Sequence, residues 1–390
     1  MSERQFGITV YGATGYTGQL ICEYLNQQYG IGGEVKWAMA GRNQEKLDSV
    51  AAKLGLGQNV PFVICDADDK DSLNAMVNNT DVVISTVGPY QLYGTALIAA
   101  CAAAGTDYVD LCGEPGWMHE MIANYEQAAR QSGARIVFSC GFDSIPFDLG
   151  VVFLQDAAKQ RFGSSMPRVK GRVRTMKGGF SGGTLASLKA TMASAAKKPD
   201  LVKVLQDPFA LTEGVKGPEQ PSGAAPIYED DLNSWSAPFI MATINTKNVH
   251  RTNYLLKHAF GKDFVYDEML LTGPGEQGKA IANAVAADKS MAKSDLKPGD
   301  GPSKEERENG SYDVLFAGSN DEGGVILASV QGDKDPGYGS TSKMIAETAV
   351  CLLKNPKAAS GGIWTPGAAL GQLLITRLQE NAGLTFKLEN

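Results

Sequence analysis

The 390-residue chain is poor in the residues from which metal sites and disulfide frameworks are built. It has three histidines, which are widely scattered, and six cysteines without a Cys-x-x-Cys pair. A zinc site therefore has little to be built from, and we expect no metal. The cysteines are typical of reduced, mostly buried thiols in a cytoplasmic protein.

Long apolar segments and an excess of basic charge are also lacking. No run of about 18 apolar residues occurs, which argues against an ordinary membrane-spanning helix. Residues 1–12 do not combine a basic start with an apolar core, so no secretory signal is expected. The net charge of −7 argues against nucleic acid as the main partner, because phosphate binding needs a basic surface.

The first 140 residues alternate short apolar runs with helical segments. The runs lack polar alternation, which is typical of strands buried on both faces of a parallel sheet. They occupy residues 8–11, 35–40, 62–65, 82–86, 108–111 and 136–139. Six such strands with crossing helices predict an α/β fold with a Rossmann-type doubly wound parallel sheet.

The pattern changes after residue 150, where longer strands mix with helices. We predict strands over residues 168–177, 239–246, 263–272, 312–318 and 324–332, which indicates an α+β domain. We expect a nucleotide-binding domain over residues 1–147, a second domain for substrate binding and dimerisation over 148–340, and C-terminal helices in 341–390 that return to the first domain. An open edge of the second sheet would allow a homodimer.

A glycine-rich turn follows the first strand. The string GATGYTG, residues 12–18, places glycines at Gly12, Gly15 and Gly18, with Ala13, Thr14, Tyr16 and Thr17 between them. The first glycine permits a tight turn, the second lets the backbone approach a pyrophosphate, and the third lets helix and strand pack closely. Its place between a strand and a helix predicts a dinucleotide site, although such a turn alone can be purely structural.

The second strand ends without the acidic residue that usually binds the ribose of NAD. Arg42 stands there instead, with Lys46 one helical turn later. A guanidinium can form two hydrogen bonds with a 2′-phosphate, so we predict NADP(H) rather than NAD(H). The alternative is an exposed arginine at the start of a loop. Asp66, after the third strand, is expected near the adenine.

The fourth strand leads into Thr86, Val87 and Gly88, which we expect to border the nicotinamide because ligands bind beyond the carboxyl ends of such strands. Tyr90 and Tyr93 follow, and a neutral phenol there could donate a hydrogen bond to a developing enolate or amide oxygen. The alternative is that both rings simply line the cleft between the domains.

Several longer strings carry a resemblance. GATGYTG, AGRN, STVGPYQLYG, YVDLCGE, CGFDSIPFDLG, SGGT, WSAPFIMATINT, DPGYGST and TPGAALG together resemble the saccharopine dehydrogenase-like oxidoreductases. Within that family the chain is most similar to the trans-acting enoyl reductases of bacterial lipid and polyketide synthesis. The resemblance implies NADPH as hydride donor, a two-domain architecture and C-terminal helices that return to the nucleotide domain.

The second domain supplies two further candidate features. Arg168, Lys170, Arg172 and Arg174 alternate along a predicted strand and so share one face, which would either hold an anionic substrate in the cleft or face water. Ser181 opens an amide-rich helix start that can hold a carbonyl oxygen or act as a plain cap. Asp143, at the junction after the last strand of the first domain, has a catalytic role or caps the next helix.

Three functions are compatible with these features. The first is NADPH-dependent reduction of an enoyl thioester, on a small molecule or a carrier-bound acyl group, with Tyr90, Tyr93, Asp143 and Ser181 as candidate catalytic residues. The second is a saccharopine-type reductase of an imine derived from an amino acid, with the basic stripe binding carboxylates. The third is an NADP-binding scaffold without turnover.

Overall fold

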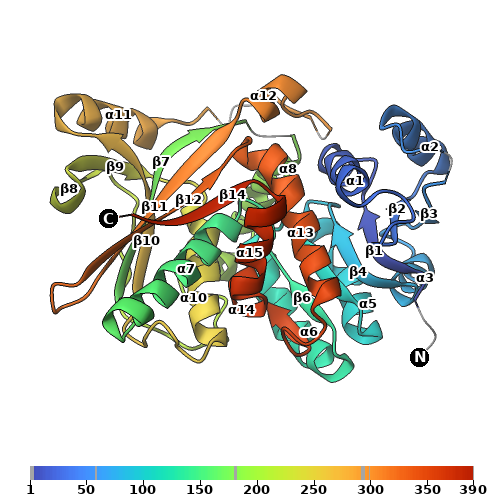
Figure 1. Cartoon of the computed structure of the whole chain (residues 1–390), viewed down its shortest axis with the longest axis horizontal. Helices are drawn as coiled ribbons and strands as arrows, with labels where there is room; N and C mark the ends of the chain where they lie inside the picture. Colours follow the sequence, from blue (N-terminus) through green and yellow to red (C-terminus); the bar gives the residue numbers. More distant parts are fainter. Residues whose placement is uncertain (1–3, 58, 180–181, 291–294, 298, 390) are drawn as a thin grey trace.

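The computed structural model describes residues 4–57, 59–179, 182–290, 295–297 and 299–389. Its described residues form two seven-stranded sheets. Figure 1 places the second sheet at the left and the first at the right, with C-terminal helices between them.

The first sheet is entirely parallel and has the order β13-β6-β5-β4-β1-β2-β3. Ile8 pairs with Trp37 on one side and with Val82 on the other, so β1 is central. The strand order reverses between β1 and β4, which is where doubly wound sheets bind their ligands. The predicted Rossmann-type sheet is confirmed. Its strands are β1 (Phe6–Tyr11), β2 (Trp37–Gly41), β3 (Phe62–Ile64), β4 (Thr80–Ser85), β5 (Asp107–Asp110), β6 (Arg135–Val137) and β13 (Gly362–Trp364).

Helices cover both faces of this sheet. One of them, α13 (Thr341–Lys354), comes from the far end of the chain and packs against β1, β4 and β5 beside the first helix (Figure 1). This contact shows that α13 returns to the first sheet, as predicted for the C-terminal helices, whereas the later helices α14 (Pro366–Ala369) and α15 (Gly371–Asn381) pack against α7 (Ile145–Phe162). The other helices are α1 (Tyr16–Tyr29), α2 (Gln44–Lys53), α3 (Lys70–Asn78), α4 (Tyr90–Tyr93), α5 (Thr95–Ala104) and α6 (Pro115–Ser132).

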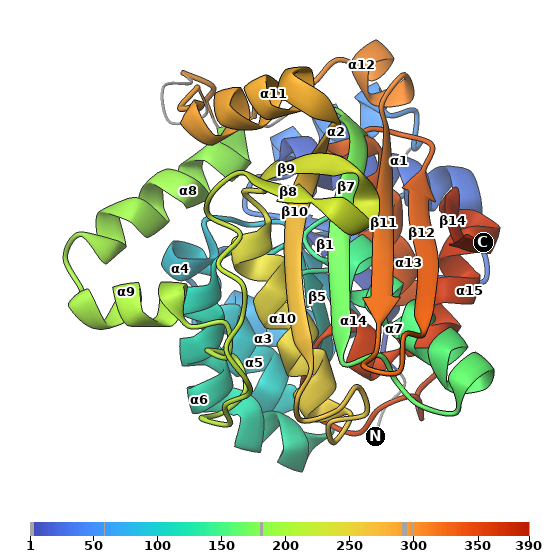
Figure 2. The ribbon, with the colours of Figure 1, turned by 90° about the vertical axis from the view of Figure 1, so that its left-hand side faces the viewer.

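The second sheet is mixed and has the order β14-β12-β11-β7-β10-β9-β8, in which only β7 and β10 run parallel. Its strands are β7 (Arg168–Lys177), β8 (Ile227–Glu229), β9 (Ser234–Pro238), β10 (Val265–Gly273), β11 (Ser311–Ser319), β12 (Val325–Gly332) and β14 (Leu384–Glu389). Figure 2 views its outer face, with α7 (Ile145–Phe162) and α10 (Ala242–Leu255) behind the strands.

The remaining helices pack in different places. They are α8 (Gly182–Ala195), α9 (Pro199–Gln206), α11 (Gly275–Ala287), α12 (Lys304–Glu308), α14 (Pro366–Ala369) and α15 (Gly371–Asn381), with the single turns η1 (Asp230–Leu232) and η3 (Pro336–Ser340). Of these helices, α11 contacts β9 and β10, α9 contacts α6, and α14 and α15 contact α7. In Figure 2, α8 and α9 project together at one side of the molecule. The α+β character predicted for this part of the chain is confirmed.

Two segments differ from the sequence-based predictions. Residues 239–246, predicted as a strand, contain the start of α10 (Ala242–Leu255). The prediction was wrong because buried polar partners on this helix outweigh local strand propensity. The last strand, β14, was not foreseen, and it joins the second sheet rather than the first. The domain boundaries at residues 147 and 340 stay predictions.

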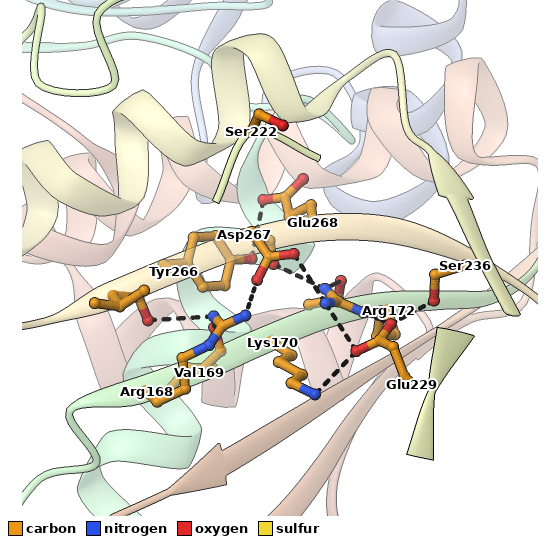
Figure 3. A network of polar contacts seen from close by, with 12 residues as sticks. Arg168, Val169, Lys170, Arg172, Ser222, Glu229, Ser236, Tyr266, Asp267 and Glu268 are labelled. Carbon is orange, nitrogen blue, oxygen red and sulfur yellow. Dashed lines mark hydrogen bonds and ion pairs between the residues drawn. The ribbon is translucent and has the colours of Figure 1, made fainter. Parts of the chain in front are cut away.

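The basic stripe of β7 lies on the outer face of the second sheet, opposite the core face that carries Val169 and Val173. All four of its cations are paired with acids, and Figure 3 shows the pairs of Arg168, Lys170 and Arg172. Arg172 is fully buried and contacts Glu229 at 2.6 Å and Asp267 at 2.8 Å. The predicted substrate-binding role of the stripe is therefore corrected, because strand alternation turns it away from the helices and its charges are already neutralised.

Glu229 shows how strong this pairing is. Burial alone would raise the pKa of its carboxyl, but the hydrogen bonds and charge of Arg172, with a further hydrogen bond from Ser236, lower the pKa to about 2. The stripe thus fixes the β8–β9 hairpin to the sheet.

Replacement of the buried arginine should be costly. Arg172→Ala leaves two carboxylates buried without their main partner, and we expect a loss of about 3 kcal/mol or more in the free energy of unfolding. Arg174→Ala is the matched control on the same strand, since Arg174 is 28% exposed and its loss should cost about 1 kcal/mol or less. Urea denaturation followed by circular dichroism measures both, and equal losses would contradict the assignment.

Candidate functional site

The glycine-rich turn has the tight geometry that a dinucleotide site requires. Gly12 has a φ of +90°, and a Cβ placed on it would lie 2.6 Å from Thr86 Oγ1. A Cβ on Gly18 would overlap the carbonyl oxygen of Gly12, so only glycine lets α1 pack this closely on β1. Gly15 is exposed directly before α1, where a pyrophosphate can approach the backbone.

The start of α1 supplies the amides of this site. The first N–H groups of a helix have no partner within it, so they are free to bind an anion. Ala13 is buried beneath the turn, while Thr14 and Thr17 are half-buried beside it. The turn fits the phosphates of a dinucleotide.

Arg42 stands at the end of β2, where the sequence lacks an acid. Its side chain is exposed and makes no hydrogen bond or ion pair with the described residues, so its donors are free for a ligand. The next residue, Asn43, caps α2 by accepting a hydrogen bond from the Lys46 backbone N–H at 2.9 Å. Lys46 is also exposed, whereas Asp66 accepts a hydrogen bond from the Asp68 backbone N–H at 3.2 Å.

The loop after β4 borders the same turn. Thr86 Oγ1 donates to the carbonyl oxygens of Tyr11 at 3.1 Å and Gly12 at 3.2 Å, which ties β4 to β1. A Cβ on Gly12 would lie 2.9 Å from the Val87 side chain, and Gly88 beyond it is exposed. These contacts bring the predicted nicotinamide-side residues to the point where β1 and β4 diverge.

The two candidate tyrosines have different surroundings. Tyr90 is buried, and its hydroxyl donates to the Ser85 carbonyl at 3.1 Å and accepts from the Leu111 backbone N–H at 3.1 Å. Burial raises the pKa of this phenol well above its usual value. Both hydrogen bonds of this hydroxyl are made within the fold, so the expectation that Tyr90 donates to substrate is corrected. Tyr93 is 44% exposed on α4.

Ser181 lies outside the described residues, but the helix that follows it is held against the first domain. The buried carboxylate of Glu114 accepts hydrogen bonds from the backbone N–H groups of Tyr90 and Gln91, each at 2.9 Å, and from Ser187 Oγ on α8 at 2.8 Å. Glu114 therefore joins the two domains at the mouth of the cofactor site. Glu114 ends the string YVDLCGE, but nothing in that string indicates a contact with α8.

Asp143 lies at the carboxyl edge of the first sheet, in the turn between β6 and α7. Its side chain is half-buried, and a Cβ placed on Gly113, in the loop after β5, would lie 3.7 Å from Asp143 Oδ2. Burial raises the pKa of this carboxyl to about 7. A large fraction of Asp143 is therefore protonated at neutral pH, as a general acid requires.

A second acid, Glu268 on β10, faces the same region from the second domain. It is fully buried and accepts hydrogen bonds from Asn245 Nδ2 and from the Tyr266 hydroxyl, each at 2.9 Å. Burial, with smaller contributions from the negative charges of Asp267 and Asp143, raises the pKa of Glu268 to about 8 despite these bonds. Two acids from different domains thus repel each other when both are ionised.

Helix α10 connects these acids. Asn245 binds Glu268, and three residues later Asn248 Nδ2 donates to Ser144 Oγ, next to Asp143, at 2.8 Å. The Oδ1 atoms of both asparagines are buried and have no hydrogen-bond partner among the described residues. Acceptors of this kind favour protonated neighbours or a bound donor. Sequence reasoning missed this site because it predicted a strand here.

Three other properties of the described residues bear on the chemistry. Among the described residues, no group of three or more His, Cys, Asp or Glu side chains is arranged to hold a metal ion. No described helix has both the length and the apolar character needed to cross a membrane. The six cysteines are all buried, free thiols.

Comparison with known proteins assigns the family. Residues 8–137 match the saccharopine dehydrogenase NADP-binding domain. The whole chain is 38% identical over 404 residues to a Mycobacterium tuberculosis protein named as a candidate trans-acting enoyl reductase, with 96% of each chain covered. It is 33% identical over 409 residues to the trans-acting enoyl reductase of Mycobacterium ulcerans, with 97% of each chain covered.

The chain belongs to the trans-acting enoyl reductase branch of the saccharopine dehydrogenase-like oxidoreductases. This member of the family is an NADP(H)-dependent oxidoreductase, as the sequence predicted.

Solved structures support the fold alone. Saccharopine dehydrogenase (L-Glu forming) of Saccharomyces cerevisiae superposes with a TM-score of 0.55 at 12% identity, covering 98% of this chain and 99% of its own. The homospermidine synthase of Legionella pneumophila, solved with NAD, gives 0.56 at 10% identity, covering 99% and 92%.

The exposed guanidinium of Arg42 predicts a test of cofactor preference. Arg42→Ala should weaken NADPH binding by about 1.5–3 kcal/mol, because it removes hydrogen bonds to a charged phosphate, and should leave NADH binding nearly unchanged. Lys53→Ala, at the other end of α2, is the control for a general loss of positive charge. Calorimetric titration measures each affinity, and wild-type protein that binds NADH as tightly as NADPH would contradict the assignment.

Proposed function

We propose that this protein reduces the carbon–carbon double bond of an α,β-unsaturated acyl thioester with NADPH, in lipid or polyketide synthesis. The observation that carries the proposal is the 33–38% identity to trans-acting enoyl reductases over almost the whole chain. The substrate is a small thioester or an acyl group on a carrier. We also propose a homodimer, in which an edge strand of the second sheet, β8 or β14, pairs with the same strand of a second copy across a two-fold axis.

The reaction needs an acid and a polar environment for developing charge. When bound, NADPH supplies a hydride for the β-carbon of the substrate. The electron pair of the double bond then moves toward the α-carbon and the thioester oxygen, and a proton must complete the new bond at the α-carbon. The protein therefore has to hold a proton where the carboxyl ends of β1, β4, β5 and β6 meet.

Asp143 fits the role of this acid better than either tyrosine. It follows β6 at the ligand-binding edge of the sheet, it is half-buried, and it makes no hydrogen bond with the described residues. A carboxyl whose pKa is raised to about 7 is protonated often enough to donate and is acidic enough to release its proton. Tyr93 remains a candidate donor to the thioester oxygen.

Glu268 is proposed as a positioning residue that acts through Asp143. The negative charge of Asp143 contributes to the raised pKa of Glu268, so Glu268 keeps the last proton of the pair and stays neutral while Asp143 titrates. Asn245 and Tyr266 hold the Glu268 carboxyl in place.

The imine-reductase alternative loses its main support. The basic stripe that was expected to bind amino-acid carboxylates is paired within the second sheet. The reductase of a neutral thioester is therefore the function that these charges favour.

Asp143→Asn tests the proton donor. It keeps the shape and removes the acid, so turnover of an enoyl thioester should fall about 10²- to 10⁴-fold while NADPH affinity and the melting temperature stay near the wild-type values. Loss of NADPH absorbance measures the rate. Asp156→Asn, on α7, is the control for loss of a half-buried aspartate elsewhere. Wild-type turnover by Asp143→Asn would remove Asp143 from the mechanism.

Glu268→Gln tests which of the two acids holds the transferred proton. Turnover should fall as pH rises because the donor must be protonated, and the fall should centre near 7, the pKa of Asp143. Glu268, with a pKa of about 8, is still mostly protonated there, so the variant should keep the centre of the fall near 7. A fall that centres near 8 in the wild type and is lost in Glu268→Gln would assign the proton to Glu268 instead of Asp143.

A further inference from the structure

A segment of the second domain lies over the start of α1, against the phosphate-binding turn. Tyr16, the first residue of α1, donates a hydrogen bond from its hydroxyl to the Pro302 carbonyl. A Cβ placed on Gly301 would come within 2.5 Å of the Tyr16 ring, so a larger residue at Gly301 could not approach as closely. The Asp300 carbonyl accepts a hydrogen bond from the Gly182 backbone N–H at the start of α8, at 3.1 Å.

Arg307 is the cation of this segment. Its Nη1 donates to the Tyr16 hydroxyl at 2.9 Å and to the Pro302 carbonyl at 2.8 Å, and its guanidinium carbon lies 5.7 Å from the centre of the Tyr16 ring. Within the described part of the chain, no bond engages Nε or Nη2 of Arg307. A half-buried guanidinium therefore retains free donors next to the helix start that faces the cofactor phosphates.

The surroundings hold Arg307 firmly. It lies on α12, which begins with a capping box formed by Ser303 and Glu306, and its carbonyl accepts a hydrogen bond from the Asp335 backbone N–H at 3.0 Å. The Asp335 carboxylate is occupied by the backbone N–H groups of Tyr338 at 3.0 Å and Gly339 at 2.7 Å.

Tyr338 also contacts the first residue of α1. Its ring packs edge-on against Tyr16, with ring centres 5.1 Å apart. The second domain thus brings a rigid cation and an aromatic ring to the start of α1.

We propose that Arg307 is a ligand of the cofactor pyrophosphate, contributed by the second domain, so that residues 300–308 close over the bound nucleotide. The pyrophosphate is the group placed at the N-terminus of α1 in this fold, whereas the 2′-phosphate lies at the end of β2, near Arg42. The two arginines therefore bind different phosphates of the same cofactor.

Nucleotide titration separates the two roles. NADPH and NADH share the pyrophosphate, so Arg307→Ala should weaken both by the same factor, about tenfold to a hundredfold, as expected for loss of hydrogen bonds to a charged group. Arg42→Ala should weaken NADPH alone. Lys304→Ala, on the same helix with a 72% exposed side chain, is the matched control and should change neither affinity.

Further variants separate phosphate binding from a merely structural contact. Tyr16→Phe removes the hydroxyl that Arg307 binds but keeps the guanidinium, so it should weaken both nucleotides less than Arg307→Ala does. The melting temperature without nucleotide shows whether each variant folds. If Arg307→Ala lowers the melting temperature and leaves both affinities unchanged, Arg307 only joins the domains and the proposal is overturned. A loss confined to NADPH would overturn the pyrophosphate assignment. These measurements use no acyl substrate, so their outcome is independent of the proposed reaction.

Discussion

Helix α7 leaves the carboxyl edge of the first sheet and immediately packs beneath the second, and the rest of the site depends on this packing. A Cβ on Gly150 would overlap the ring of Phe316, so helix and strand are as close as a glycine allows. Asp148, buried on the same helix, accepts hydrogen bonds from Thr252 Oγ1 at 2.5 Å and from the Gly367 backbone N–H at 2.7 Å. These contacts fix the position of α7, and therefore also the position of Asp143 in the turn directly before this helix.

This enclosure decides the charge states of the acids. Within the described parts of the chain, neither Asp143 nor Glu268 forms an ion pair with a cation, and burial raises the pKa of each. Glu229 is also buried, but the neighbouring Arg172 holds its pKa well below the usual value. The same carboxyl group is thus easily protonated in one place and a permanent anion in another, because in a low-dielectric interior the nearest partner dominates.

Local chemistry explains which predictions succeeded. The turn from Gly12 to Gly18 depends on contacts between residues close in sequence, so the spacing of its glycines is sufficient to identify it. The prediction for residues 239–246 failed because α10 is stabilised by distant partners: Asn245 binds Glu268 and Asn248 binds Ser144. Likewise, alternation along β7 correctly placed its basic side chains on one face, but only the packed sheet showed which face that was.

The sequence by itself determined the Rossmann-type sheet, its phosphate-binding turn and the absence of an acid beside Arg42, because each is written in residues a few positions apart. Only the tertiary structure decided that Tyr90 is occupied within the fold, that Asp143 and Glu268 influence each other, and that Arg307 reaches Tyr16. Arg307 and Tyr16 are 291 positions apart in the chain. No local pattern encodes such a contact, since it arises only when the two domains pack together.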